Sequence, residues 1–151
     1  MISIRPQRLQ VQGTCVALDG AGVLLRGPSG AGKSDLALRL IDDGAVLVAD
    51  DLCEIRCEGE RLVIDLPAAV DPAFRGKIER RGVGVVSRPY FGPAALLLVA
   101  DLLAAAAGRG SPPLPLSIEF LGQSCRRIDL DPFGPAAMAI LRSKATQALV
   151  E

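Results

Sequence analysis

The chain has 151 residues, and its 17 Lys and Arg residues balance its 17 Asp and Glu residues, so the formal net charge is zero. This balance excludes the strong basic excess that is typical of nucleic-acid-binding proteins, and the absence of histidine excludes a mixed Cys/His zinc site. The length suits one domain over residues 1–151, and the polar first residues and short apolar runs predict a cytoplasmic protein without membrane insertion.

Hydrophobic patterns and glycine-rich turns predict the elements in chain order. In the first half these are a strand over 11–18, a hairpin turn over 19–22, a buried strand over 23–26, a helix from 35 that ends near 42–44, a doubly buried strand over 45–49, and a strand pair over 52–57 and 61–64. In the second half they are a loop with one helical turn over 67–75, a mobile charged segment over 76–84, a core strand over 94–100, an unstructured loop over 104–115, a hairpin over 116–121 and 125–130, and a helix over 135–150. This order predicts an α/β domain with a mixed sheet.

Residues 27–34 have the sequence Gly-Pro-Ser-Gly-Ala-Gly-Lys-Ser, which fits the phosphate-binding P-loop pattern G-x-x-x-x-G-K-[ST]. A strand before the loop and a helix after it direct backbone N–H groups and the positive helix end into one concavity, which binds phosphate. Lys33 is expected to contact the β- and γ-phosphates, and Ser34 to ligate Mg²⁺. The predicted nucleotide-binding residues are Gly27, Pro28, Ser29, Gly30, Ala31, Gly32, Lys33 and Ser34.

Two acidic residues, Asp50 and Asp51, directly follow the apolar run over 45–49. A P-loop needs a second acidic element near its metal, and in many NTPases an apolar strand that ends in Asp supplies it. If this strand lies beside the P-loop strand, Asp50 lies at the C-terminal edge of the sheet, where open α/β folds bind ligands. A polar turn that only ends the strand is the alternative interpretation.

The residue types available for catalysis are limited. Without histidine, acid–base chemistry falls to carboxylates or lysines. The four cysteines have no C-x-x-C spacing and are expected to be reduced thiols; they are Cys15, Cys53, Cys57 and Cys125.

Residues 78–85, Ile-Glu-Arg-Arg-Gly-Val-Gly-Val, form a charged segment that by itself is typical of a solvated surface. Together with the P-loop, the Asp35 that follows it and the Asp50-Asp51 pair, this segment resembles the catalytic domain of bacterial HPr kinase/phosphorylase. The resemblance extends over residues 11–91. Larger family members carry an extra N-terminal domain, so the chain is similar to the short, single-domain form.

The resemblance implies the fold, the reaction and the partner. The fold would be a P-loop kinase-like α/β domain with a mixed sheet, as in the C-terminal domain of HPr kinase. The reaction would be ATP- and Mg²⁺-dependent phosphorylation of a serine on HPr, the phosphocarrier protein of the phosphotransferase system. In the reverse reaction, inorganic phosphate would attack phosphoserine-HPr and yield pyrophosphate. Family members form hexamers, so a homo-oligomer is also implied.

The same resemblance implies roles for individual residues. Asp50 would accept the serine proton, with Asp51 as a supporting acid, while Lys33 and the P-loop amides would hold the transferring phosphoryl group. Glu79 would join Ser34 as a ligand of Mg²⁺. The loop that contacts the protein substrate would contain Arg81, Gly82, Val83 and Gly84.

The sequence departs from the family pattern at identifiable positions. Gln12 stands where the family usually has a histidine near the transferred phosphate, and glutamine can hydrogen-bond but cannot titrate. Asp35 replaces a glutamate that is common in longer members. A functional arginine of the family is matched only by Arg109. We keep Gln12 and Arg109 as catalytic candidates beside Lys33 and Asp50.

Two other functions stay open at this point. A small-molecule P-loop kinase would need an arginine-bearing lid and a substrate pocket, and no such segment stands out in the sequence. A nucleotide- or phosphate-sensing protein with weak or no transfer activity is compatible with the missing histidine.

Overall fold

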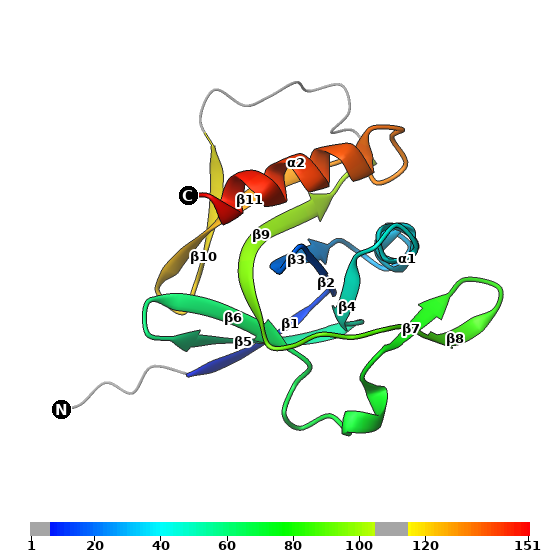
Figure 1. The fold of residues 1–151 in the computed structure, drawn as a ribbon, viewed down its shortest axis with the longest axis horizontal. Coiled ribbons are helices and arrows are strands. Elements are labelled where there is room, and N and C mark those ends of the chain that lie inside the picture. The colour runs from blue at the N-terminus through cyan, green and yellow to red at the C-terminus, as the bar shows by residue number, and fades with distance from the viewer. Residues whose placement is uncertain (1–6, 105–114) are drawn as a thin grey trace.

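The computed structural model of the protein describes residues 7–104 and 115–151. They form a mixed nine-stranded sheet, a separate strand pair and two helices (Figure 1). The strands are β1 (Arg8–Gln12), β2 (Thr14–Leu18), β3 (Ala21–Arg26), β4 (Val46–Ala49), β5 (Leu52–Glu58), β6 (Arg61–Asp65), β7 (Lys77–Arg80), β8 (Gly84–Ser87), β9 (Ala94–Leu102), β10 (Leu116–Phe120) and β11 (Gln123–Leu130). The helices are α1 (Lys33–Asp42) and α2 (Ala137–Leu149), and a single 3-10 turn spans Pro72–Phe74.

The large sheet has the order β1-β5-β6-β9-β3-β2-β4, and β10 and β11 extend it from β9. The pairs β3–β9 and β9–β11 are parallel, whereas the other pairs are antiparallel, so the predicted mixed sheet is confirmed. Strand β9 changes partner along one side. Its first two residues pair with β6, and residues 98–102 pair with β11.

The P-loop strand β3 is a buried strand, as predicted for 23–26, with Arg26 at its end partly buried. Side chains alternate across a strand, so Val23 and Leu25 pack in one cluster with the two helices, while Leu24 packs in the other cluster inside the curled sheet. All three side chains are 0% exposed. Each such aliphatic side chain contributes about 1.5–3 kcal/mol on burial, which fixes the strand that leads into the P-loop.

The strand expected over 11–18 is two strands. Gly13 separates β1 from β2 with a φ of 152°, and a Cβ there would lie 2.7 Å from the carbonyl oxygen of Leu25. Only glycine fits at this crossing, where β1 leaves to pair with β5 and β2 continues into the predicted hairpin with β3.

The segment 76–84, predicted as mobile, contains β7, which pairs with β8 in the separate two-stranded sheet. Ile78 is 1% exposed and packs in the cluster that contains the helices, so it ties the hairpin to the domain. The hairpin projects from the body beside α1 (Figure 1).

The C-terminal hairpin and helix are confirmed as β10–β11 and α2. The predicted loop over 104–115 falls almost wholly outside the described residues. Within the described ranges, neither helix has the length and apolar character needed to cross a membrane.

Candidate functional site

The P-loop, Asp50 and the first residue of β2 meet at one edge of the sheet. Strand β2 lies between β3 and β4 and runs antiparallel to both, so it starts where they end. Strand β4 is therefore not directly beside the P-loop strand, which was the condition for placing Asp50 at this edge. Asp50 still lies at the edge where β3 enters the P-loop, and the inserted strand adds Thr14 between them.

The glycines give the P-loop its shape. Gly30 and Gly32 have φ values of 83° and 93°, which side-chain-bearing residues rarely adopt. A Cβ on Gly27 would lie 2.9 Å from the Cβ of Ala31. Gly32 is the N-cap of α1, so the partial positive charge of this helix end is directed at the loop.

Lys33 is folded over its own loop. Its Nζ donates hydrogen bonds to the carbonyl oxygens of Gly27 at 2.6 Å and Pro28 at 3.1 Å. The ammonium is thereby held beside the concavity of the P-loop, within the set of side chains that line it. A phosphate there would meet a cation that is already in place.

The carboxylate of Asp50 joins three other elements. Its Oδ1 accepts hydrogen bonds from the hydroxyls of Thr14 at 2.8 Å and Ser34 at 3.2 Å. Its Oδ2 accepts a hydrogen bond from the backbone N–H of Glu79 at 3.3 Å. The structure therefore brings the predicted residues Ser34, Asp50 and Glu79 together around one charged group.

Asp51 forms a tight turn with Asp50. Its φ is 70°, a left-handed value, and the N–H of Leu52 bonds the carbonyl of Asp50 at 2.8 Å. The carbonyl oxygen of Asp51 accepts a 3.0 Å hydrogen bond from the N–H of Gly13. The turn directs Asp50 toward Ser34 and leaves Asp51 exposed at the same cavity.

These groups line a cavity of about 340 Å³. The lining residues are Thr14, Ser29, Gly30, Gly32, Lys33, Ser34, Asp35, Asp50, Asp51, Glu79, Arg81 and Phe133. The described residues hold no group of three or more Cys, Asp or Glu side chains that could cage a metal ion. Mg²⁺ needs no such cage, because it usually keeps several waters and binds through one or two protein oxygens plus substrate phosphates. The hydroxyl of Ser34 and the carboxylate of Glu79 fit that pattern.

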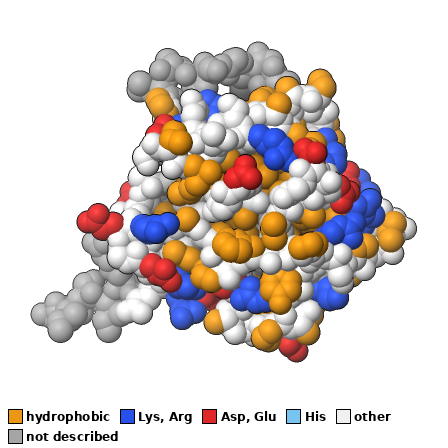
Figure 2. Space-filling view, in the orientation of Figure 1, with side chains coloured by type: hydrophobic (Ala, Val, Ile, Leu, Met, Phe, Trp, Pro, Cys, Tyr) orange, Lys and Arg blue, Asp and Glu red, His pale blue; other side chains and the backbone are white. Residues whose placement is uncertain are grey.

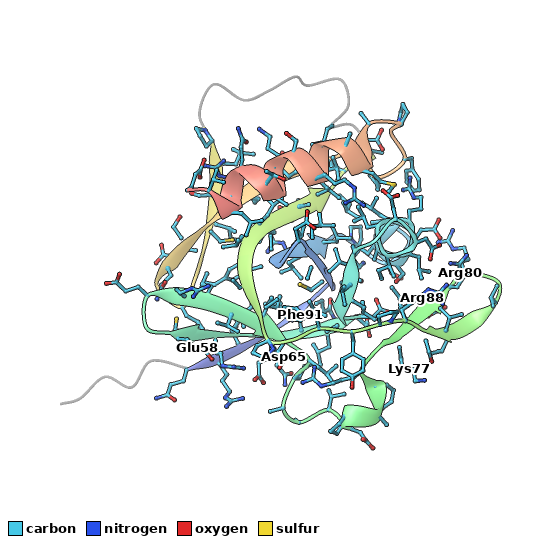
Figure 3. The ribbon with its side chains drawn as sticks, in the orientation of Figure 1. Glu58, Asp65, Lys77, Arg80, Arg88 and Phe91 are labelled. Carbon is cyan, nitrogen blue, oxygen red and sulfur yellow. The ribbon has the colours of Figure 1, made fainter. Side chains whose placement is uncertain are left out.

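The β7–β8 hairpin carries Glu79 and Arg81 to the cavity. Arg80 pairs with Asp42 at 3.2 Å and Arg88 pairs with the same carboxylate at 3.6 Å, which ties the hairpin to the end of α1 (Figure 3). Figure 2 shows basic side chains gathered at the right of the view, where the hairpin and α1 lie. The buried side chain of Ile78 and the two ion pairs with Asp42 thus set the position of the hairpin.

A second ionic network fixes the strand that enters the P-loop. Arg26, the last residue of β3, donates two hydrogen bonds to Asp101 at 2.8 and 3.0 Å, and Arg127 donates a third at 3.0 Å. Partial burial raises the pKa of the Asp101 carboxyl, but the hydrogen bonds and charges of Arg26 and Arg127 outweigh it, so the pKa lies below its ordinary value. The ionised carboxylate joins β3, β9 and β11.

The four cysteines are unpaired thiols, as predicted. Burial, followed by the charge of Asp50, raises the pKa of Cys53 to about 12. Burial raises the pKa of Cys15 well above its ordinary value. At neutral pH both thiols are protonated, so they serve as small apolar core groups.

The structure does not bring every predicted residue into the cavity. Gln12 is exposed at the end of β1 and is not among the lining residues. Gly82, Val83 and Gly84 lie beyond the lining, at the exposed tip of the hairpin. Arg109 lies outside the described residues.

Two lining residues were missed from the sequence. Thr14 could be found only once β2 was known to run between β3 and β4. Phe133 reaches the P-loop from the turn before α2, and no sequence pattern connects the two segments.

Comparison with known proteins finds one family. The model described as HPr Serine kinase C-terminal domain matches residues 5–99. The HPr kinase/phosphorylase of Chlorobium limicola is 44% identical over 94 residues, which is 62% of this chain and 28% of the relative. That of Caldicellulosiruptor bescii is 45% identical over 80 residues, which is 52% of this chain and 24% of the relative. The chain thus spans 28% and 24% of the lengths of these two relatives.

A solved structure resembles the whole fold. The Hpr(Ser) kinase/phosphatase from Coxiella burnetii matches with a TM-score of 0.78 and 22% sequence identity, covering 94% of this chain and 97% of that chain. At this identity the likeness shows the fold, and it confirms the fold class predicted from the sequence.

Proposed function

The chain belongs to the HPr serine kinase C-terminal domain family, and we propose that it transfers a phosphoryl group from ATP to a serine of the phosphocarrier protein HPr. One observation carries the proposal. The carboxylate of Asp50 is hydrogen-bonded to Ser34 of the P-loop, so a proton acceptor and a phosphate-binding loop share one cavity. The names of the relatives support the choice of HPr as the acceptor.

Binding of the phosphates would use the groups already at the loop. Lys33 would exchange the carbonyl oxygens of Gly27 and Pro28 for the phosphate oxygens, which carry full negative charge. The N-terminus of α1 would add its partial positive charge. Phosphoryl transfer depends mainly on such positioning and charge stabilisation.

The carboxylate of Asp50 would accept the proton of the attacking serine hydroxyl and return it in the reverse direction. Thr14 and the N–H of Glu79 hold that carboxylate in one orientation. Ser34 and Glu79 would hold Mg²⁺, which when bound would neutralise charge on the β- and γ-phosphate oxygens. Asp51, exposed at the same cavity, would act as the supporting acid.

The acceptor protein would approach over the β7–β8 hairpin. Arg81 lies at the cavity, and Val83 and Val85 on the same hairpin are 71% and 70% exposed. A charged residue followed by exposed aliphatic side chains suits contact with a folded protein. Arg81, Gly82, Val83 and Gly84 therefore form the proposed acceptor-binding loop.

The proposal includes phosphorolysis of phosphoserine-HPr to pyrophosphate and assembly into a homo-oligomer, both implied by the family. One observation favours a second function, a nucleotide or phosphate sensor with little transfer activity. Gln12 cannot titrate, and it lies outside the cavity lining.

The test incubates the protein with labelled ATP, Mg²⁺ and HPr. We expect label on an HPr serine, and we expect the Asp50→Asn variant to bind ATP but to transfer no label. Asp19→Asn, at an exposed turn outside the cavity lining, is the matched control and should behave as wild type. ATP binding by the wild-type protein without transfer would overturn the kinase and favour the sensor.

A further inference from the structure

An exposed aromatic side chain stands at the edge of the P-loop. Phe133 lies between β11 and α2, lines the cavity, and is 65% exposed. Among the described residues that line this cavity it is the aromatic one, and most of the others are polar or charged. The ring therefore offers an apolar wall to a ligand whose polar part is held by the rest of the cavity, which is the usual division of a small-molecule site.

The turn that carries Phe133 is held in place. Asp131 caps it, because its Oδ1 accepts a hydrogen bond from the N–H of Phe133 at 3.0 Å and its carbonyl oxygen accepts one from the N–H of Gly134 at 3.2 Å. The carbonyl oxygen of Pro132 accepts a 2.5 Å hydrogen bond from Arg39 of α1. The turn is therefore fixed to the helix that begins with Lys33.

The ring lies against the P-loop itself. A Cβ built on Gly32 would lie 3.3 Å from each of two ring atoms of Phe133. Any larger residue at this position would push the ring away. The absence of a side chain at Gly32 thus allows the aromatic ring to approach the loop that grips phosphate.

The position of the ring suits the organic part of a nucleotide. The P-loop would hold the phosphates, so the ribose and base would extend from the loop toward the border of the same cavity, where Phe133 lies. Every nucleobase has a π-face, and aromatic side chains stack on it with little dependence on base identity. We propose that Phe133 stacks on the base of the bound nucleotide. The inference rests on the proposed function in one respect, namely that the P-loop holds a nucleoside triphosphate.

The first experiment uses fluorescence. The chain contains no tryptophan, so Phe133→Trp is a single-tryptophan reporter at the proposed stacking position. We expect ATP with Mg²⁺ to quench its emission and inorganic tripolyphosphate with Mg²⁺ to leave it unchanged. Phe74→Trp is the matched control, since Phe74 is 61% exposed and lies outside the cavity lining, and neither ligand should change its emission.

The second experiment measures affinity by calorimetry. Phe133→Ala should weaken ATP binding by about 5- to 150-fold and leave tripolyphosphate binding unchanged, because only ATP carries a base. Phe133→Tyr should retain wild-type affinity for ATP. An equal loss for both ligands would show that Phe133 shapes the P-loop, and no loss for either would show that the base lies elsewhere; both results overturn the inference.

The two proposals fail in different ways. If the wild-type protein binds ATP through Phe133 but transfers no label to HPr, the kinase is overturned and the stacking inference stands. If transfer occurs and Phe133→Ala binds ATP as well as wild type does, the inference is overturned and the kinase stands. A wild-type protein that binds tripolyphosphate but not ATP contradicts both.

Discussion

The hydroxyl of Thr14 donates a 2.8 Å hydrogen bond to Oδ1 of Asp50, although the two residues lie 36 positions apart in the chain. Thr14 is 1% exposed, so this hydroxyl is sheltered from water and has a fixed partner. The contact exists because β2 runs antiparallel to β4 and starts where β4 ends. Thr14 is therefore a positioning residue for the proposed proton acceptor.

Replacing Thr14 by valine keeps the shape of the side chain and removes the hydroxyl. A hydrogen bond to a charged group contributes about 1.5–3 kcal/mol, so the rate constant of transfer should fall roughly 10- to 150-fold. Affinity for ATP should stay at the wild-type value, because Ser34 and Lys33 are untouched. Steady-state kinetics with HPr measures the rate constant and the affinity for ATP separately. Thr14→Ser should restore most of the rate. A loss of ATP affinity alone would contradict the positioning role.

The two left-handed glycines of the P-loop should differ in their response to alanine. Gly30→Ala introduces backbone strain of about 1–2 kcal/mol, since nothing lies within 4 Å of the added Cβ. Gly32→Ala adds the displacement of Phe133 to a similar strain. Thermal unfolding should therefore show the lower melting temperature for Gly32→Ala. In a Phe133→Ala background the difference between the two alanine variants should shrink, and an unchanged difference would contradict the ring contact.

Asp101 should make the free energy of unfolding depend on pH in the acidic range. Its pKa is lowered in the folded protein, so its contribution is fully present above its unfolded pKa of about 4 and is lost as pH falls through the lower folded pKa. Asp101→Asn should reduce the free energy of unfolding at pH 7, and the gap to wild type should narrow as pH falls below about 4. Urea unfolding across this range measures the gap. A gap that stays constant with pH would show that the ionised form of Asp101 is not the stabilising species.

The thiols should divide into one accessible group and three protected ones. Cys15 and Cys53 are buried with raised pKa values, and burial raises the pKa of Cys125 to about 11. Cys57 is the partly exposed one. With a thiol-specific disulfide reagent at pH 8, we expect one fast reaction per native chain and four after unfolding, because the thiolate is the reacting species. Cys57→Ser should remove the fast reaction, and a second fast thiol in that variant would contradict the burial.

Local sequence patterns predicted the parts of the site that depend on local backbone. The P-loop needs glycines at positions with positive φ and a lysine at the start of a helix, and all of these lie within residues 27–34. Asp50 was predicted as a site residue because it directly follows an apolar strand. The partners of Asp50 were only partly predictable, because Ser34 is in the motif while Thr14 comes from a strand inserted by the sheet topology.

The other differences between the predicted and the observed structure also come from tertiary contacts that a local sequence pattern does not contain. The apolar pattern over 11–18 continues through Gly13, and only the approach of Leu24 and Leu25 shows why the chain must divide there. The charged composition of 76–84 conceals Ile78, a buried aliphatic side chain that anchors the hairpin. Phe133 reaches the P-loop through tertiary packing, and the sequence of its own turn does not predict that contact.

The contact between Arg26 and Asp101 spans 75 positions of the chain, and this separation affects how the chain can fold during its synthesis. On the ribosome, residues 27–34 emerge long before β9 exists, so the strand that leads into them lacks its parallel neighbour until residue 102 has been made. Pairings between such distant segments form slowly, because a long loop must close before any contact is gained. Between the synthesis of residue 34 and that of residue 102, the nascent chain therefore carries its phosphate-binding motif without the strand partner that fixes the geometry of the motif.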